Sequence, residues 1–305
     1  MKLAAFDVGT NTVLMVAVEV GADHRPRVFV ELGRITRLGR GVDRTGALDP
    51  ETSANTLAAI EEFAQCARDL GVRPFYAVAT SALRDARDGA AFISTVRERV
   101  GVELRVISGE EEAALSHLAV MRGLAIDPRA KLLIVDVGGG STELIRAEPG
   151  RPLDLVSLQL GSVRLSERIV RSDPPTTDEV TKLRQTIDEA LAAAAWDFCP
   201  DAVVGIAGTV TTICAVSEAL DADRLGTTHG HTVSLSDVKR VRKLFGSMPL
   251  VERLKLRGLA EGRADVIFAG TMILERVLER FGAAAVTVGD QGVRWGLIWK
   301  AVDEA

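Results

Sequence analysis

The chain repeats one short pattern about half its length apart. Asp7-Val8-Gly9-Thr10-Asn11-Thr12 aligns with Asp136-Val137-Gly138-Gly139-Gly140-Ser141, and in both copies the acid ends one apolar segment and a second apolar segment follows the turn. A self-match of this kind indicates a repeated structural unit. At 305 residues the chain is long enough for about two domains. The repeat therefore predicts two domains of similar plan that face each other across a cleft.

The composition of the repeated turn is suited to holding phosphate. Glycine has no Cβ, so backbone N–H groups can approach a ligand closely, and consecutive N–H groups form a nest for anions. Thr12 and Ser141 add hydroxyl donors. Asp7 and Asp136 can hold a hydrated Mg²⁺ that bridges to phosphate oxygens. A single copy could be only a tight turn, but two aligned copies favour a pair of phosphate-binding turns.

The elements around the repeat indicate an α/β class with mixed sheets. Apolar segments predict strands at residues 3–6, 13–20, 28–32, 75–79, 102–107, 132–135, 203–207 and 286–288. Asp49-Pro50 and Thr176 with Glu179 predict helix starts. Helical patterns also cover residues 250–281. Pro128 breaks a helix before the next strand, so we expect domains at residues 1–124 and 125–305.

Charge and composition exclude several classes of protein. The net charge of -5 excludes a globally basic nucleic-acid binder, although a small anion can still bind. The sequence contains no uncharged apolar run of 18 residues, and an acid at position 7 interrupts any signal-peptide core. We therefore expect a cytoplasmic, soluble protein with no DNA, RNA or membrane partner.

The cysteines and histidines suggest no metal centre. Cys66, Cys199 and Cys214 are far apart and match no zinc spacing, so we expect small buried hydrophobic residues. His229 and His231 form a possible pair, but no nearby cysteine or third ligand at helical spacing supports it, which favours a polar loop.

Two further features bear on a phosphate site. Gly208-Thr209 begins a third glycine turn between a strand and a helix, and a helix N-terminus binds anions readily, although threonine is also an ordinary cap. Glu143 occupies the position where the first copy of the repeat has Leu14, so the two copies differ in polarity there. No G-K-[ST] sequence of a P-loop occurs.

Taken together, the motifs resemble those of a known family. The two repeated turns resemble the phosphate motifs of the actin/Hsp70/sugar-kinase fold, and the whole set resembles the Ppx/GppA family of exopolyphosphatases and guanosine pentaphosphate phosphohydrolases. The other matching stretches are Ala79–Arg84, Ser108–Ala113, Leu160–Leu165, Gly208–Thr212 and Gly289–Arg294. The resemblance implies two actin-like (RNase H-like) domains, with a last helix at about residues 295–305 that packs back on the first domain.

The resemblance also implies an activity. Family members remove the terminal phosphoryl group of linear polyphosphate, or the 5′ γ-phosphate of guanosine pentaphosphate (pppGpp), with Mg²⁺. We expect Mn²⁺ to substitute for Mg²⁺, and we expect a homodimer. The alternatives are an ATP-dependent kinase of the same fold, for which Gly208–Thr212 is the candidate adenosine pocket, and a non-catalytic nucleotide or polyphosphate sensor.

The resemblance assigns the site residues position by position. The resemblance places the water-activating carboxylate on Glu112, the phosphate-facing arginine on Arg84, and metal and phosphate carboxylates on Asp136 and Glu143. Asp88 stands where family members commonly have Asn. The expected set is catalytic Glu112, Glu143 and Arg84; metal-binding Asp7, Asp136 and Glu143; and phosphate-binding Gly9, Thr10, Asn11, Thr12, Gly138, Gly139, Gly140, Ser141, Gly208 and Thr209.

Local chemistry separates three adjacent acids. Ser108 follows a strand and precedes a helix, so it predicts an N-cap. Glu111 at the third helical position would complete a capping box, and Glu110 suits the positive end of the helix dipole. Glu112 has no capping role, and it is the position on which the resemblance places the water-activating carboxylate.

Overall fold

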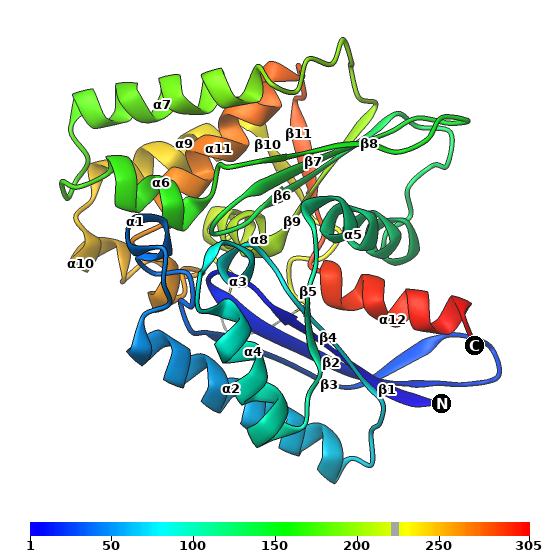
Figure 1. Ribbon diagram of the computed structural model, residues 1–305. Coiled ribbons are helices and arrows are strands. Elements are labelled where there is room, and N and C mark those ends of the chain that lie inside the picture. Colours follow the sequence, from blue (N-terminus) through cyan, green and yellow to red (C-terminus); the bar gives the residue numbers. More distant parts are fainter. Residues whose placement is uncertain (221–225) are drawn as a thin grey trace. The chain divides into compact units, whose positions relative to one another are not determined.

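The computed structural model describes residues 1–220 and 226–305, which form two compact units (Figure 1). The first unit comprises Met1–Arg122 and Gly292–Ala305, and the second comprises Gly123–Gln291. The C-terminal segment therefore belongs to the first unit. No helix among the described residues is long and apolar enough to cross a bilayer.

The first unit is built on a five-stranded sheet of order β3-β2-β1-β4-β5. Its strands are β1 (Lys2–Val8), β2 (Thr12–Val20), β3 (Pro26–Ile35), β4 (Phe75–Ala79) and β5 (Leu104–Val106). Its helices are α1 (Val42–Thr45), α2 (Pro50–Asp69), α3 (Ser81–Asp85), α4 (Gly89–Val100), α5 (Gly109–Gly123) and α12 (Val293–Asp303).

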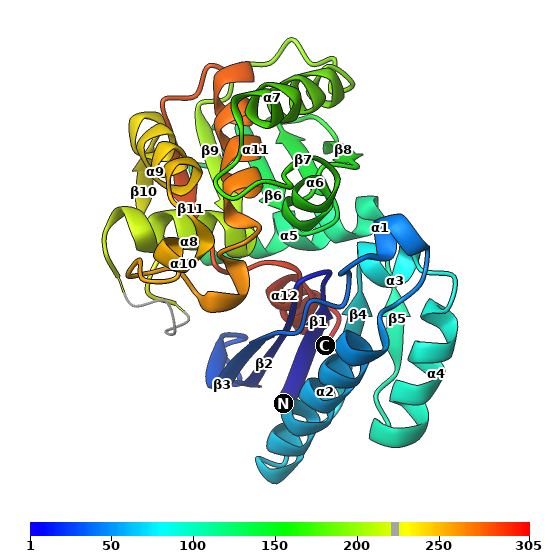
Figure 2. The same ribbon diagram turned by 90° about the vertical axis from the view of Figure 1, so that its left-hand side faces the viewer.

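Helices cover both faces of this first sheet (Figure 2). Phe6 and Met15 face the core formed with α2 and α4, whereas Leu3 and Val16 face the core formed with α5 and α12. Because both faces are buried, the central strands are apolar at nearly every position rather than at every second one. The polar residues are thereby displaced to the strand ends and turns.

The second unit has a six-stranded sheet of order β10-β11-β9-β6-β7-β8. Its strands are β6 (Leu132–Val137), β7 (Thr142–Ala147), β8 (Asp154–Leu158), β9 (Ala202–Ile206), β10 (Thr232–Ser234) and β11 (Ala285–Val288). Its helices are α6 (Ser162–Ile169), α7 (Thr177–Leu191), α8 (Ala207–Ser217), α9 (Leu235–Ser247), α10 (Leu250–Arg253), a 3₁₀ turn (Glu261–Arg263) and α11 (Ile267–Arg280).

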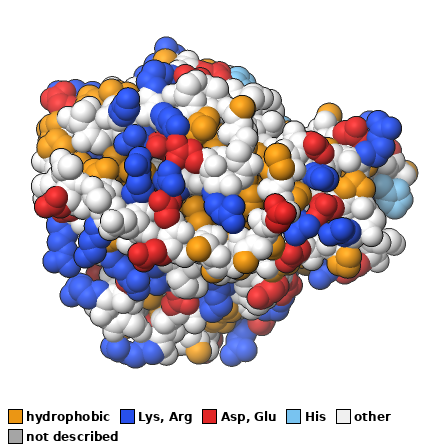
Figure 3. Space-filling model, turned by 90° about the horizontal axis from the view of Figure 1, so that it is seen from above, with side chains coloured by type: hydrophobic (Ala, Val, Ile, Leu, Met, Phe, Trp, Pro, Cys, Tyr) orange, Lys and Arg blue, Asp and Glu red, His pale blue; other side chains and the backbone are white. Residues whose placement is uncertain are grey.

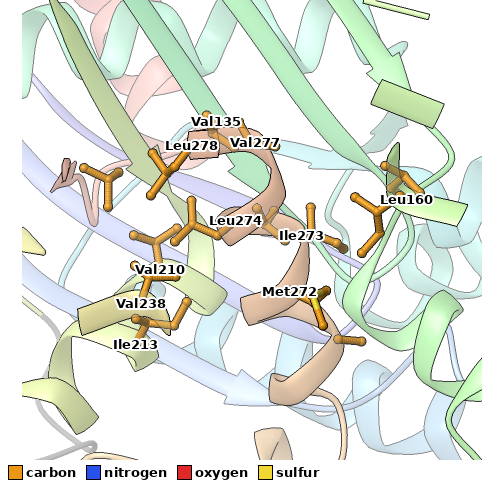
Figure 4. Close-up of a cluster of buried hydrophobic side chains, with 14 of the residues drawn as sticks. Val135, Leu160, Val210, Ile213, Val238, Met272, Ile273, Leu274, Val277 and Leu278 are labelled. Carbon is orange, nitrogen blue, oxygen red and sulfur yellow. The ribbon is translucent and has the colours of Figure 1, made fainter. Parts of the chain in front are cut away.

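An aliphatic core fixes the second sheet against its helices (Figure 4). Val135 of β6, Val210 of α8, Val238 of α9 and Leu274 of α11 belong to one cluster of buried side chains. Leu274 is fully buried. This core holds the strand ends that carry the second copy of the repeat.

The two sheets share one topology. In each, three successive strands form an antiparallel meander, and two later strands add in parallel beside the first: β1 pairs with β4, and β4 with β5, as β6 pairs with β9, and β9 with β11. The repeated pattern lies on the equivalent hairpins β1–β2 and β6–β7. The expected fold class, two mixed actin-like α/β units, is confirmed.

One long helix expected from the sequence is wrong. Residues 250–281 form α10, the 3₁₀ turn and α11 instead of a continuous helix. Gly258 lies between them with a φ of +88°, and a Cβ there would come within 2.5 Å of the Ala215 backbone. A tertiary contact therefore breaks the helical pattern that the sequence shows locally.

The expectation of three buried cysteines is also only partly met. Cys214 is buried on α8, whereas Cys66 is partly exposed and Cys199 is exposed. Composition predicted a small apolar residue at all three positions, but only Cys214 lies in the aliphatic core.

Candidate active site

Both copies of the repeat form the same turn. The N–H of Gly9 donates to Thr12 O at 3.0 Å, and the N–H of Gly138 donates to Ser141 O at 3.0 Å. A Cβ on either glycine would lie only 3.2 or 3.1 Å from the carbonyl oxygen that closes its turn. The requirement for glycine at the first position of the turn is therefore the same in both units.

A neighbouring segment holds the carbonyl groups of each turn. In the first unit, Asn11 O accepts the N–H groups of Thr36 and Arg37, each at 3.0 Å, and Thr10 O accepts the N–H of Gly39 at 2.8 Å. In the second unit, the N-terminus of α6 holds the carbonyl groups of the turn. The N–H of Val163 donates to Gly139 O at 2.9 Å, and Arg164 Nε donates to Gly140 O at 2.7 Å.

The carbonyl groups of the second turn accept hydrogen bonds from α6, but two of its amide groups donate none to the described residues. Within the part of the chain that the structure describes, the N–H groups of Gly139 and Gly140 donate no hydrogen bond. Gly161 permits the close approach of α6, because a Cβ there would lie 2.1 Å from Gly139 O. Two adjacent unbonded amides are the composition of an anion nest.

Polar groups surround the turn of the first unit. Thr10 Oγ1 and Ser81 Oγ share a hydrogen bond of 2.8 Å, which ties the turn to the start of α3. Asn11 is 7% exposed, and neither its Oδ1 nor its Nδ2 has a hydrogen-bond partner among the described residues. A buried amide without partners is costly unless a ligand satisfies it. Asn11 thus marks this turn as a binding position.

Asp7 lies at the end of β1 beside this turn. Burial raises the pKa of Asp7 to about 6, and the positive charge of Arg294 on α12 opposes the rise. Its Oδ1 is buried with no hydrogen-bond partner among the described residues. Arg294 itself donates to Glu31 on β3, from Nε at 3.0 Å and from Nη2 at 2.6 Å. A buried carboxylate oxygen without a hydrogen-bond partner is suited to bind a cation.

Glu112, which is buried, lies next to the partly exposed Arg84 in the first unit. Glu112 lies in the first turn of α5 and is 8% exposed, and its Oε2 is 3.6 Å from Arg84 Nη1. Arg84 also donates to Ile107 O at 2.9 Å, which fixes the guanidinium at the end of the neighbouring strand segment. Glu112 is therefore a positioned carboxylate.

The neighbouring acids behave differently from Glu112. The N–H of Glu111 donates to Ser108 Oγ at 3.1 Å, so the predicted N-cap is confirmed. The predicted capping box is wrong in its second half, because the Glu111 carboxylate binds both terminal nitrogens of Arg105, at 2.5 and 2.6 Å. The Glu110 carboxyl is exposed, and hydrogen bonds from its own amide and from Ser108 lower its pKa. Glu112 is the one of the three that is buried.

Asp136 and Glu143 form a pair of acids in the second unit. They lie directly opposite each other on β6 and β7, and they are 7% and 1% exposed. Ser157 on β8 donates to Glu143 Oε1 at 2.7 Å and so fixes one of its oxygens. Like charges in a directly opposed cross-strand pair repel. A hard cation such as Mg²⁺, which prefers carboxylate oxygens, would relieve that repulsion.

The third glycine turn lies at the start of α8 in the same unit. A Cβ on Gly208 would fall about where the Arg263 guanidinium lies, with Arg263 Nη2 only 1.9 Å away. Burial lowers the pKa of Arg263 to about 10. Thr209 Oγ1 donates to Val137 O at 2.9 Å, and this hydrogen bond links the start of α8 to the end of β6. A desolvated cation at a helix N-terminus favours an anion there.

The structure thus distributes the predicted site residues over both units. Asp7, Gly9–Thr12, Arg84 and Glu112 lie in the first, and Asp136, Gly138–Ser141, Glu143, Gly208 and Thr209 lie in the second. Sequence analysis missed four residues that hold or flank them. Ser81 and Arg294 lie in stretches already noted for their resemblance, whereas Ser157 and Arg263 carry no local sequence signal.

Several basic side chains on the helices of the second unit pair with acids. Lys239 pairs with Glu279 at 2.6 Å, Arg240 with Asp237 at 3.1 Å, and Lys255 with Glu252 at 2.7 Å. Arg253 is 4% exposed and pairs with Asp173. On the face seen in Figure 3, Lys and Arg side chains are interspersed with Asp and Glu.

Two actin-like units, each with a glycine turn next to a strand-end acid, define a protein that handles phosphate groups. The model of the Ppx/GppA phosphatase family matches residues 16–305, so the chain belongs to that family. It is 33% identical over 311 residues to exopolyphosphatase 2 of Mycobacterium tuberculosis, covering 97% of each chain.

Two other relatives extend the comparison. The crystal structure of the Aquifex aeolicus Ppx/GppA family member superimposes with a TM-score of 0.83 at 30% identity, covering 100% of this chain and 98% of that one. The guanosine-5'-triphosphate,3'-diphosphate pyrophosphatase of Vibrio cholerae is 29% identical, covering 99% of this chain and 59% of the relative. The predicted family and the predicted class, a hydrolase of phosphoanhydride bonds, are confirmed.

Proposed function

We propose that the protein is a Mg²⁺-dependent phosphohydrolase that releases terminal orthophosphate from linear polyphosphate, and that it also converts pppGpp to ppGpp. The opposed acids Asp136 and Glu143, next to the unbonded amides of Gly139 and Gly140, are the observation that carries this proposal. Carboxylates alone would repel phosphate, and amides alone would bind it without a cation. The combination suits a metal–phosphate complex.

The two activities are supported to different degrees. Exopolyphosphatase 2 of Mycobacterium tuberculosis is 33% identical and matches this chain over nearly its whole length. The Vibrio cholerae pyrophosphatase is 29% identical, and this chain spans 59% of it. We therefore place polyphosphate first and pppGpp second.

In the proposed reaction, the chain's own groups bind the phosphate and move one proton. The amides of Gly139 and Gly140 donate to oxygens of the terminal phosphoryl group. Mg²⁺, when held by Asp136 and Glu143, would neutralise charge on the phosphate oxygens. As the new bond from the water oxygen to phosphorus forms, the water gives up a proton; the resemblance assigns its acceptance to Glu112, which is a buried carboxylate of the first unit. The bond from phosphorus to the bridging oxygen breaks, and the shortened chain leaves with that oxygen.

Arg84 has a positioning role in this scheme. Its Nη1 lies 3.6 Å from Glu112 Oε2 and donates to Ile107 O. The guanidinium, fixed by Ile107 O, thus holds the Glu112 carboxylate in place. Its remaining N–H groups suit phosphate oxygens.

The test is a measurement of phosphate release with polyphosphate, pppGpp and ATP supplied separately, each with Mg²⁺ and with chelator. We expect release from polyphosphate, slower release from pppGpp, and none from either in chelator. Glu112→Gln should remove release from both, with Glu111→Gln as the matched control. Full activity in chelator, or release from ATP alone, would refute the proposal.

A further inference from the structure

Cys214, Glu218 and His231 converge at the C-terminal end of α8. Each offers one ligand atom, and the three atoms lie within 4.8 Å of one another. Cys214 Sγ is 3.8 Å from Glu218 Oε1, and His231 Nδ1 is 2.8 Å from Glu218 Oε2. None of the three takes part in the proposed hydrolysis. The sequence alone does not connect Cys214 with His231, because 16 residues separate them and no spacing rule links them.

The backbone fixes all three residues. Cys214 and Glu218 are one helical turn apart, and the N–H of Glu218 donates to Cys214 O at 3.0 Å. His231 precedes β10, and its carbonyl accepts the N–H of Val288 on β11 at 2.8 Å. The ligand atoms are thus carried by a helix end and a sheet edge, and no large movement is needed to bring them together.

Charge at this helix end favours a cation. The C-terminus of a helix carries a partial negative charge, and α8 has no basic residue in its last turn. Arg240 reaches the same helix end, but its guanidinium bonds to Ser217 Oγ at 2.9 Å and to Asp237.

The donor set selects the type of ion. A thiolate, an imidazole and a carboxylate are ligands for zinc, whereas Mg²⁺ prefers oxygen ligands alone. Zinc bond lengths give ligand-to-ligand edges of about 3.2–3.8 Å in a tetrahedron. The sulfur lies 3.8 Å from Glu218 Oε1 and the imidazole nitrogen lies 2.8 Å from Glu218 Oε2, so binding through one oxygen requires the carboxylate to turn and the three ligand atoms, which lie within 4.8 Å of one another, to draw together.

We propose that Cys214 Sγ, one carboxylate oxygen of Glu218 and His231 Nδ1 bind a zinc-class divalent cation, with water in the fourth position. On binding, the sulfur–hydrogen bond of Cys214 breaks, its proton goes to solvent, and the thiolate sulfur bonds to the metal. His231 binds as the neutral imidazole. The ion joins the end of α8 to β10, so it stabilises the second unit without touching the phosphate chemistry.

Cobalt titration of the metal-free full-length chain tests the site, because Co²⁺ bound by a thiolate gives a ligand-to-metal charge-transfer band that carboxylate sites lack. We expect the band to saturate at one equivalent, to be bleached by Zn²⁺ and to be unaffected by Mg²⁺. Zn²⁺ should also raise the melting temperature. Cys214→Ala should abolish the band, and His231→Gln should weaken the Co²⁺ affinity at least about tenfold.

Two controls separate this site from the others. Cys199→Ala removes an exposed thiol and should leave the band intact, and Asp136→Ala removes a carboxylate of the proposed Mg²⁺ site and should also leave it intact. Absence of the band in the wild-type chain, or its loss in Cys199→Ala, would overturn the proposal. If Cys214→Ala fails to fold, the partly exposed His231→Gln variant decides, and an unchanged Co²⁺ affinity there counts against the site.

Discussion

Asp136 and Glu143 face each other across β6 and β7, and at the same place in the first unit Asp7 faces Leu14 across β1 and β2. The two hairpins match in register and in turn geometry, but only the second carries two opposed acids. The duplicated fold therefore supplies two turns of one kind and one paired-acid site.

We expect Glu143→Leu, which gives the second hairpin the residue of the first, to abolish the Mg²⁺-dependent activity. It should reduce phosphate release by at least about 10²-fold, since it removes one of two metal-binding carboxylates. The variant should melt at or above the wild-type temperature in chelator, because the repulsion with Asp136 is gone. An assay of phosphate release measures the loss of activity, and calorimetry with and without Mg²⁺ measures the melting temperatures.

A second variant controls for packing at this position. Ser157→Ala removes the hydrogen bond to Glu143 Oε1 but keeps both charges. We expect a rise in the Mg²⁺ concentration needed for half-maximal activity and a smaller loss of rate. If Glu143→Leu retains a Mg²⁺-induced stabilisation equal to that of wild type, the paired acids do not bind the ion.

The duplicated hairpins were predictable from the sequence because their signals are local. The apolar strands, the glycine turn and the Glu143–Leu14 difference all lie within a few residues of one another, and the structure places each where expected. Arg263 and Ser157 could not be predicted. Arg263 reaches Gly208 from 55 residues away, and Ser157 meets Glu143 only through the pairing of β7 with β8. Such contacts depend on tertiary packing, and no spacing rule encodes them.

Glu112→Gln and Glu111→Gln should differ sharply in activity. Glu112 is buried beside Arg84, and we expect its amide variant to lower turnover by about 10²–10⁴-fold, as for a lost general base. Glu111 lies in an exposed pair with Arg105, so its amide variant should cost only about 0.2–1 kcal/mol of stability and keep most activity. Steady-state phosphate release and urea unfolding measure the two quantities. Equal rates in the two variants would show that Glu112 is not the base.

Gly161→Ala should disturb the second turn from outside. A Cβ at Gly161 would lie 2.1 Å from Gly139 O and 2.5 Å from the Gly140 carbonyl carbon, so the turn or α6 must move. We expect a loss of about 1–3 kcal/mol in unfolding free energy and a raised KM, because the amides of the turn shift. Gly292→Ala is the matched control, since a Cβ there meets nothing within 4 Å. Similar KM values for the two variants would mean that the turn does not contact substrate.

Asp7→Asn should stabilise the metal-free protein, with an effect that depends on pH. Burial raises the pKa of Asp7 from its ordinary value to about 6, so the folded state favours the protonated carboxyl. Ionisation of Asp7 therefore costs stability as the pH rises from about 4 to above 6, and the amide variant avoids that cost. We expect a gain of about 1–3 kcal/mol at pH 8 and little change at pH 4. Melting temperatures across this range in chelator measure it. With Mg²⁺ present at pH 8 the gain should shrink, because the ion stabilises only the wild-type carboxylate; a gain that is the same at pH 4 and pH 8 would show that the Asp7 charge is not the cause.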